Sequence, residues 1–291
     1  AIGMFDGVHL GHQQVIRQAV SDAHQLESSS LCVTFDKHPA TVIAPERAPL
    51  LIQSLDQRLE AIRALGVDAT LILPFDEAMS QIPAEAFIKG LAVDLGRISS
   101  ICVGAQFAFG QGRKGNVKLL HQLGQELHFV AHGTASVALD GETVSSTRIR
   151  QAIAGGQLDL VGQMLGREYA LAGKVIRGDQ RGRELGFPTA NLEITDRCTP
   201  PNGVYAAHAE VDGEPYRAAV NIGLRPTLKD PEPALHVEAY LLDFDGEIYD
   251  RVCTLTFVGK LREEQSFDSL DALRAQIEKD VVQARYLFTQ L

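Results

Sequence analysis

The hydrophobic pattern of this chain changes once, near Gly166, and this change restricts the folds that are open to it. Before Gly166, short apolar runs alternate with amphipathic segments, which is typical of a parallel sheet with helices on both faces. After Gly166, short strands and turns follow one another closely, as in an antiparallel barrel or sandwich. We therefore expect an α/β domain at residues 1–165 and a β domain at residues 166–291.

Local signals predict elements in both halves. The first half predicts buried strands at residues 31–35, 69–73 and 101–103, and helices at residues 84–94, at residues 117–123 and from the N-cap Ser54 to Gly66. The second half predicts hairpins at Asp212-Gly213 and Asp245-Gly246, and a helix from Leu270 to Leu287. Only Ala1 and Ile2 precede the first glycine, so we expect a nearly absent first strand and further residues upstream.

Composition argues against several classes of protein. The net charge of −10 argues against a broad nucleic-acid-binding face, although a local group of donors can still hold a small phosphorylated ligand. No apolar run approaches the roughly 18 residues that cross a bilayer, so no membrane contact is expected. Four widely spaced cysteines predict reduced core thiols in a cytoplasmic protein: Cys32, Cys102, Cys198 and Cys253.

The strongest chemical signal is the stretch from Gly3 to His12, where a glycine turn leads into a helix that carries two histidines. Backbone N–H groups at the turn, the helix N-terminus and imidazoles on one face suit a triphosphate. The alternatives are a tight turn with solvated histidines and a zinc site formed by Asp6, His9 and His12, whose spacing is one residue short of the helical arrangement. We favour phosphate binding.

A second anion site is predicted where Ser145, Ser146 and Thr147 open a helix and Arg148 and Arg150 follow. Ordinary N-capping by serine explains one hydroxyl but not three hydroxyls followed by two arginines. Taken alone, this segment leaves the two interpretations equal.

Two other segments follow predicted strands of the first half. His38 comes soon after a buried strand and points either at a ligand or into water. Phe107 and Phe109 either line a slot for a flat ring or pack in the core. The G-x-G-x-x-G string at residues 110–115 is a weak match to the dinucleotide site of a dehydrogenase, because it lies several residues beyond its strand.

The second half contains no Walker A string, so a kinase site there needs another phosphate loop. The segment from Gly178 to Asn191 is the candidate, because strand alternation puts Thr189 and Asn191 on one face, where both oxygens could meet Mg²⁺ carried by ATP. The alternative is a surface turn. Glu238 lies on the polar face of a predicted strand and is either a proton acceptor or a solvated acid.

These segments form ordered motifs. The first half contains Gly3-x-Phe5-Asp6-Gly7-x-His9-x-Gly11-His12, Phe35-x-x-His38-Pro39, Val103-Gly104-x-x-Phe107-x-Phe109-Gly110 and Ser145-Ser146-Thr147-x-x-Arg150. The second half contains Pro188-Thr189-Ala190-Asn191, Gly203-Val204-Tyr205, Asn221-Ile222-Gly223-x-Arg225-Pro226-Thr227 and Glu238 followed by Leu241-Leu242-Asp243-Phe244. In this order, and over essentially the whole chain, they resemble the bacterial bifunctional riboflavin kinase/FMN adenylyltransferase (FAD synthetase) family.

The resemblance implies that the first domain is a Rossmann-like nucleotidyltransferase that makes FAD from FMN and ATP. Its implied ATP-binding residues, with His9 and His12 also catalytic, are Gly3, Phe5, Asp6, Gly7, His9, His12, Ser146, Thr147 and Arg150. Its implied flavin-binding residues are His38, Gln106, Phe107 and Phe109. Met4 stands where the family often has Asn, and Gln106 where it usually has Asp or Asn, so we expect altered flavin contact.

For the second domain the resemblance implies a six-stranded antiparallel β-barrel with a C-terminal helix and riboflavin kinase activity. Glu238 would accept the proton of the ribityl hydroxyl, and Thr189 and Asn191 would bind Mg²⁺ with ATP. The implied ATP-binding residues are Gly178, Arg181, Gly182, Gly186, Pro188, Thr189 and Asn191. The alternatives are a riboflavin kinase whose first domain is impaired and a non-catalytic flavin-nucleotide sensor. The sequence does not indicate an oligomeric state.

Overall fold

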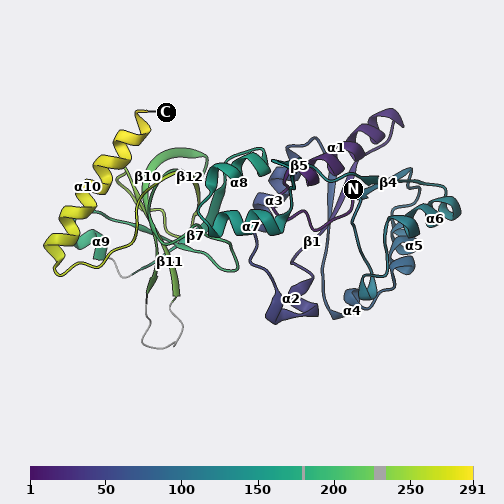
Figure 1. Ribbon diagram of the computed structural model, residues 1–291, viewed down its shortest axis with the longest axis horizontal. Coiled ribbons are helices and arrows are strands. Elements are labelled where there is room, and N and C mark those ends of the chain that lie inside the picture. Colours follow the sequence, from purple (N-terminus) through teal and green to yellow (C-terminus); the bar gives the residue numbers. More distant parts are fainter. Residues whose placement is uncertain (179–180, 226–233, 291) are drawn as a thin grey trace. The chain divides into compact units, whose positions relative to one another are not determined.

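The structure, a computed structural model, describes residues 1–178, 181–225 and 234–290 (Figure 1). Contacts within the chain divide it into two compact units. The first contains Ala1–Arg150 and Met164–Gly166, and the second contains Gln151–Gln163 and the chain from Arg167 onwards.

The first unit is built on parallel strands. Its strands are β1 (Leu31–Phe35), β2 (Ala69–Leu73), β3 (Ser100–Gly104) and β4 (Val130–Thr134), with a short antiparallel pair of β5 (Ala138–Leu139) and β6 (Glu142–Thr143). β1 pairs with β2 and β3 pairs with β4, both in parallel. Ile2 joins the two pairs, because it bridges Val33 in parallel and donates its N–H to the carbonyl of Cys102 at 3.1 Å. The nearly absent first strand is therefore confirmed, and β4 is a strand that the sequence did not predict.

Helices cover both faces of this sheet, as predicted. The helices of this region are α1 (Leu10–Gln25), α2 (Ala40–Ile43), α3 (Leu55–Arg63), α4 (Glu77–Ser80), α5 (Ala84–Asp94) and α6 (Val117–Leu127), with 3₁₀ turns η1 (Pro45–Arg47) and η2 (Gln111–Arg113). Two more helices, α7 (Ser146–Ala154) and α8 (Leu158–Leu165), each contribute residues to both units. Val33 and Val103 pack with α5 and α6 in one core. Cys32 and Cys102 pack with α1 and α3 in another. Since neighbouring residues of a strand face opposite ways, each strand serves both cores.

Local capping explains where α3 and α6 lie. Ser54 caps α3 as predicted, with its hydroxyl accepting from the N–H of Gln57 while the Gln57 side chain accepts from the N–H of Ser54. α6 runs four residues beyond its predicted end, because the chain leaves the helix only at His128, which adopts the left-handed conformation with φ of 60°.

The second unit contains a closed barrel of six strands in the order β10-β11-β8-β7-β12-β9, with all pairs antiparallel. The strands are β7 (Ala170–Ile176), β8 (Ala190–Glu193), β9 (Gly203–Val211), β10 (Glu214–Arg225), β11 (Ala234–Leu241) and β12 (Val252–Arg262). Beside its parts of α7 and α8, this unit contains α9 (Arg181–Glu184) and α10 (Leu270–Phe288). The predicted barrel and C-terminal helix are both confirmed, and α10 lies along the barrel in Figure 1.

The two predicted hairpins have different outcomes. Asp212 and Gly213 have φ of 53° and 84° and join β9 to β10 in a tight turn, so this prediction is confirmed. The hairpin at Asp245-Gly246 is wrong, because β11 pairs with β8 and β10 while β12 pairs with β7 and β9. Both edges of β11 are taken by other strands, so the chain must travel through residues 242–251 to reach a different part of the barrel.

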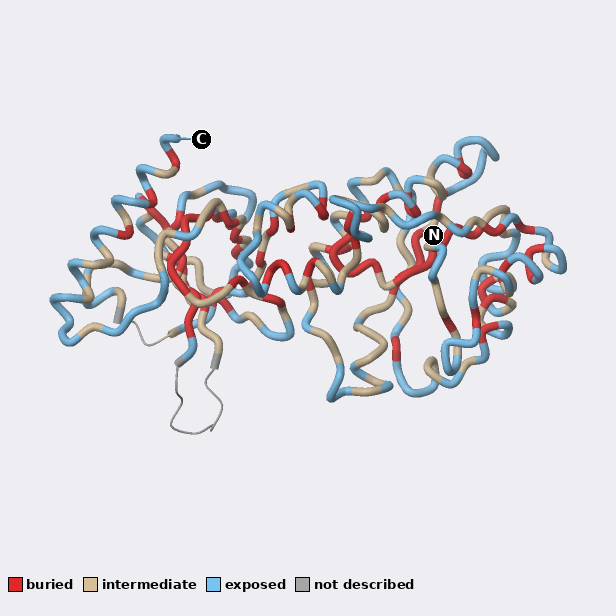
Figure 2. The backbone as a smooth tube through the Cα atoms, viewed as in Figure 1, coloured by how far each residue is buried: buried red, intermediate tan, exposed pale blue. Residues whose placement is uncertain are grey.

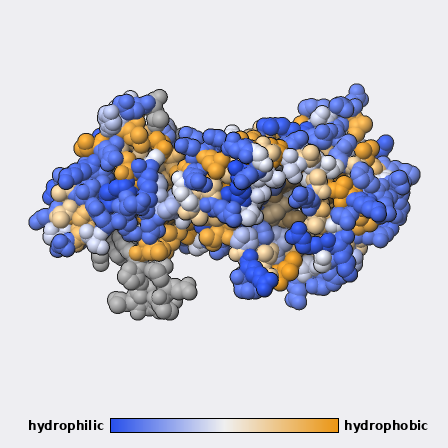
Figure 3. Space-filling view, in the orientation of Figure 1, coloured by the Kyte–Doolittle hydropathy of each residue, from blue (hydrophilic) through white to orange (hydrophobic). Residues whose placement is uncertain are grey.

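Burial follows this architecture. Figure 2 shows buried residues along the barrel strands and on the inner faces of the helices, and Figure 3 shows hydrophilic residues over most of the visible surface. All four cysteines are buried and free, and burial raises the pKa of the Cys102 thiol to about 12. Among the described residues, no helix combines the length and apolar character that a bilayer span requires.

Candidate functional site

Residues 3–8, named the nucleotide loop for their predicted role, form a strained turn between the first bridge and α1. Phe5 and Val8 have φ of 53° and 39°, in the left-handed region that side chains disfavour, and Gly7 has φ of 89°. Strain of this kind persists only where the surroundings impose it, and it is concentrated at ligand-binding sites. The backbone conformation of this loop is therefore typical of a ligand-binding turn, in agreement with its glycine-rich sequence.

The two histidines lie together at the start of α1. Their rings stack with centroids 3.6 Å apart, and Nδ1 of His9 accepts the N–H of His12 at 3.3 Å, so His9 is the N-cap of the helix. A neutral His9 therefore carries its proton on Nε2. Burial, followed by His9 and Arg150, holds the pKa of His12 well below its usual value, and Nδ1 of His12 has no hydrogen-bond partner within the described chain.

A pocket opens beside these rings, at the carboxyl ends of the bridge strand, β3 and β4. Of the predicted residues, Gly3, Phe5, His9, His12, Gln106 and Phe107 line it, together with Met4. Residues 134–137, which follow the unpredicted strand β4, complete the wall. The sequence therefore located most of one wall of this pocket and missed the other.

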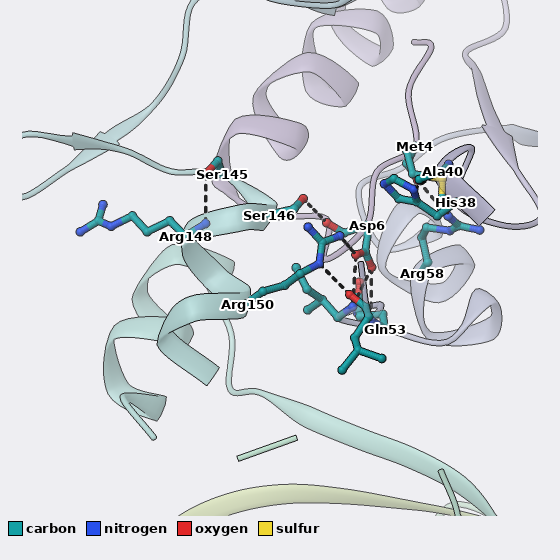
Figure 4. A network of polar contacts seen from close by, with 12 residues as sticks. Met4, Asp6, His38, Ala40, Gln53, Arg58, Ser145, Ser146, Arg148 and Arg150 are labelled. Carbon is teal, nitrogen blue, oxygen red and sulfur yellow. Dashed lines mark hydrogen bonds and ion pairs between the residues drawn. The ribbon is translucent and has the colours of Figure 1, made fainter. Parts of the chain in front are cut away.

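Asp6, Ser146 and Arg150 form a network of their own (Figure 4). The buried Asp6 carboxylate accepts from the N–H of Ile52 at 3.0 Å and pairs with Arg150 at 2.6 Å. The Ser146 hydroxyl donates to the Asp6 carbonyl at 2.9 Å. This network ties α7 to the nucleotide loop, whereas Thr147 is exposed and, like the other three, does not line the pocket. Direct contact of these residues with phosphate stays a prediction.

Two predicted flavin residues lie outside the pocket. Nδ1 of His38 accepts the N–H of Ala40 at 3.1 Å, and burial together with Arg150 lowers its pKa. The Phe109 ring belongs to the hydrophobic core, where it stacks on Phe107 with centroids 5.2 Å apart. The G-x-G-x-x-G string packs against the start of α5, since a Cβ on Gly110 would lie 2.4 Å from Cα of Ala84. Its first glycine, Gly110, lies well beyond Gly104 at the end of β3, whereas the glycines of a dinucleotide site follow their strand directly.

The second site is a pocket between the barrel wall and α10. Glu238 on β11 pairs in register with Asn191 on β8 and with Asn221 on β10, so three polar side chains form a row on one face of the barrel. This row and Thr189 line the pocket, whose far wall is formed by residues of α10 and of the segment before it: Phe267, Leu273, Ile277 and Val281. The predicted group of Thr189, Asn191 and Glu238 is therefore brought together.

A neighbouring pocket shares Thr189 and Asn191. Its other walls include Gly178, Pro188 and residues 244–249. A Cβ on Gly178 would lie 2.4 Å from Nδ2 of Asn191, so a larger residue there would displace that amide. Thr189 and Asn191 thus separate two cavities, and a ligand in each would meet the other at these two side chains.

The remaining predicted kinase residues have other positions. Gly182 lines the Glu238 pocket, and a Cβ there would lie 2.4 Å from the Phe187 carbonyl oxygen. Gly186 lines neither pocket and has φ of 85° in the turn after α9. The backbone of Arg181 begins α9, whereas its side chain lies outside the described part, as do Pro226 and Thr227 of the motif.

Sequence reasoning missed several residues that line the second site. Asn221 was part of a motif without a role, and Arg262, Glu264 and Asp280 were not singled out. Asn221 did carry a signal, because it is a polar residue between the buried apolar Val220 and Ile222. The others meet only through pairing of distant strands and the packing of α10.

Comparison with known proteins agrees with this geometry. Residues 1–148 match the family model described as FAD synthetase, and residues 165–288 match the one described as riboflavin kinase. The chain is 39% identical over 286 residues to the bifunctional riboflavin kinase/FMN adenylyltransferase of Pseudomonas fluorescens, covering 98% of this chain and 91% of the relative. It is 36% identical over 288 residues to the protein of that name from Escherichia coli (strain K12), covering 99% and 91%.

A solved structure has the same fold across both units. The crystal structure described as a macrolide-efflux protein from Streptococcus pneumoniae superposes with a TM-score of 0.82 at 28% identity, covering 98% of this chain and 92% of that one. Fold and site together define a two-domain flavin-nucleotide transferase. The chain belongs to the bifunctional riboflavin kinase/FMN adenylyltransferase family.

Proposed function

We propose that this protein phosphorylates riboflavin to FMN with one ATP and then converts FMN to FAD with a second ATP, releasing pyrophosphate. The observation that carries the proposal is that each predicted set of chemical residues lines a pocket in its own unit: His9 and His12 in the first, Thr189, Asn191 and Glu238 in the second. Residues 1–165 would act as the adenylyltransferase and residues 166–291 as the kinase. The free, buried thiols support a cytoplasmic location.

In adenylyl transfer, a phosphate oxygen of FMN attacks the α-phosphorus of ATP and the bond to pyrophosphate breaks. No covalent enzyme intermediate is needed, so the protein acts by positioning and by stabilising charge on the phosphates. The stacked His9 and His12 would donate to ATP phosphates, and negative phosphate beside His12 would favour the protonated ring that burial otherwise disfavours. Asp6 would hold Arg150 and the loop in place through its buried ion pair.

In the kinase step, the ribityl 5′-hydroxyl attacks the γ-phosphorus of ATP, and ADP leaves. Glu238 lines the pocket in which riboflavin would bind and would accept the proton of this hydroxyl. The apolar wall of the same pocket on α10 suits a flat ring. ATP would occupy the pocket on the other side of Thr189 and Asn191. The phosphoryl group would then pass from one pocket to the other beside Thr189 and Asn191, which line both.

The two residues between the pockets, Thr189 and Asn191, fit Mg²⁺. The Thr189 hydroxyl and the Asn191 amide are the oxygen donors that this ion prefers, and the space beside Asn191 is kept open by Gly178. Mg²⁺ bound there with ATP phosphates would neutralise charge as the phosphoryl group is transferred. Among the described residues, no three His, Cys, Asp or Glu side chains are grouped as a metal site, so the phosphates themselves would supply further ligands.

One time course tests both activities. Riboflavin, FMN and FAD are followed with Mg-ATP for the wild type, for Glu238→Gln and for His9→Asn with His12→Asn. Glu238→Gln should lose FMN formation and keep FAD formation from supplied FMN, whereas the double variant should accumulate FMN. FMN without FAD from the wild type would indicate a kinase with an impaired first domain. Ligand binding without turnover would indicate a sensor.

A further inference from the structure

Helix α3 carries a buried arginine beneath the first site. Arg58 is 3% exposed, and its guanidinium donates to the carbonyl oxygens of Met4 at 2.9 Å, Phe35 at 2.6 Å and Asp36 at 3.5 Å. Its Nη1 also lies 3.4 Å from Sδ of Met4. Figure 4 shows Arg58, Met4 and His38 gathered on one side of the network. Arg58 does not line the pocket, so its contacts are with the loops around it.

Those carbonyl groups belong to two separate loops. Met4 lies in the nucleotide loop, which leads directly to His9. Phe35 and Asp36 stand at the end of β1 and lead to His38. A guanidinium is planar and has five N–H donors in fixed directions, so a single side chain can fix the distance between the two loops.

The charge of Arg58 is not balanced by an acid in contact with it. Among the described residues, no carboxylate lies within ion-pair distance of the guanidinium, and its buried Nε has no hydrogen-bond partner. The two nearest acids have other partners, since the Asp6 carboxylate binds Arg150 and the Asp36 carboxylate accepts the N–H of Phe75 at 2.8 Å. Burial accordingly lowers the pKa of Arg58. A buried cation of this kind is costly for folding, whereas it favours anionic phosphates bound by the loops above it.

We propose that Arg58 is a positioning residue for adenylyl transfer, which holds the nucleotide loop and the His38 loop at the separation that the attacking phosphate and ATP require. This inference rests on the proposed function of the first unit. It adds a residue outside the recognised motifs and predicts that one side chain, touching neither substrate, sets the apparent affinity for both.

The test compares three variants of the full chain: Arg58→Met, Arg58→Lys and the matched control Arg63→Met. Arg63 lies on the same helix and is exposed, and within the described part of the chain its side chain pairs only with the neighbouring Glu60 at 3.5 Å. KM for ATP, KM for FMN and kcat are measured for adenylyl transfer. Riboflavin phosphorylation by the same molecules reports the integrity of the second unit, and circular dichroism reports the folding of the whole chain.

Arg58→Met should raise both KM values and lower kcat/KM by about 10²-fold, the cost of a displacement of about 1 Å in a site. Arg58→Lys keeps the charge but not the fork, so both KM values should stay raised. Arg63→Met should change each constant by less than about twofold. If Arg58→Met does not fold, Arg58→Lys decides the question in the same way.

Two results would overturn the inference. One is unchanged KM values with a lowered kcat or a lowered melting temperature, as a merely structural residue would give. The other is wild-type behaviour of Arg58→Lys, which would assign the effect to the positive charge rather than to the hydrogen bonds that Arg58 donates to both loops. Absence of adenylyl transfer in the wild type is a separate outcome, because it refutes the proposed function itself.

Discussion

Removing the Asp280 carboxylate should destabilise the barrel unit much more than removing the Asp243 carboxylate, although both acids form two-point ion pairs with arginine. Asp280 on α10 accepts from Nε and Nη2 of Arg262 at 2.9 and 2.8 Å, and from the Gln276 side chain at 2.8 Å. Asp243 accepts from Nη1 and Nη2 of Arg285 at 2.8 and 2.6 Å. The two pairs therefore have matched geometry and involve the same helix.

They differ in burial. The side chains of Arg262 and Asp280 are 19% and 5% exposed, whereas those of Arg285 and Asp243 are 46% and 72% exposed. Asp280→Ala leaves the mostly buried Arg262 cation without its acid, which costs up to about 3–5 kcal/mol of unfolding free energy. Asp243→Ala should leave the unfolding free energy near its wild-type value, because water screens an exposed pair.

The chain provides a specific probe for this measurement. It contains no tryptophan, and its six tyrosines all lie in the second unit, the first of them being Tyr169. Tyrosine fluorescence during urea unfolding therefore follows the barrel unit alone. A decrease of less than about 1 kcal/mol in the unfolding free energy for Asp280→Ala would refute the reasoning, because leaving a buried charge unpaired should lower it by more than this.

Two further predictions concern residues of the two proposed sites. Gly178→Ala should push Asn191 out of place and lower riboflavin phosphorylation by about 10²-fold with FAD formation from FMN unchanged, while Gly90→Ala, where a Cβ meets nothing within 4 Å, should alter neither rate. His12→Gln should flatten the pH dependence of stability, measured by urea unfolding of the first unit at several pH values. Burial lowers the pKa of His12 in the folded state, so the wild type loses stability as pH falls below about 6.5, by up to about 1.4 kcal/mol per pH unit; an unchanged slope in the variant would contradict this.

Elements specified by local contacts could be predicted from the sequence. The N-cap at Ser54 and the turn at Asp212-Gly213 each depend on residues within a few positions of one another, and both predictions are confirmed. The same signal at Asp245-Gly246 failed, because the partners of β11 are set by closure of the barrel. β4 escaped prediction for a related reason, since His132 and Gly133 interrupt its apolar run, so that its sequence is a poor strand signal on its own.

The sites show the same division. His9 and His12 are one helical turn apart, so their proximity follows from the sequence alone. Asn221 joins Glu238 only through the register of β10 and β11, and Arg58 reaches Met4 only through the packing of α3. Phe109 illustrates the converse, because a motif names the residue while tertiary packing decides that its ring enters the core.

The wall shared by the two barrel pockets has a consequence for inhibitors. Thr189 and Asn191 face both cavities, so a compound lodged against either side would shift the affinity for the ligand on the other side as well. Inhibition would then be competitive against the substrate whose pocket the compound occupies and mixed against the other substrate. A resistance mutation at either residue would weaken binding of the natural substrates along with that of the drug. Resistance should therefore arise with difficulty at the start of β8.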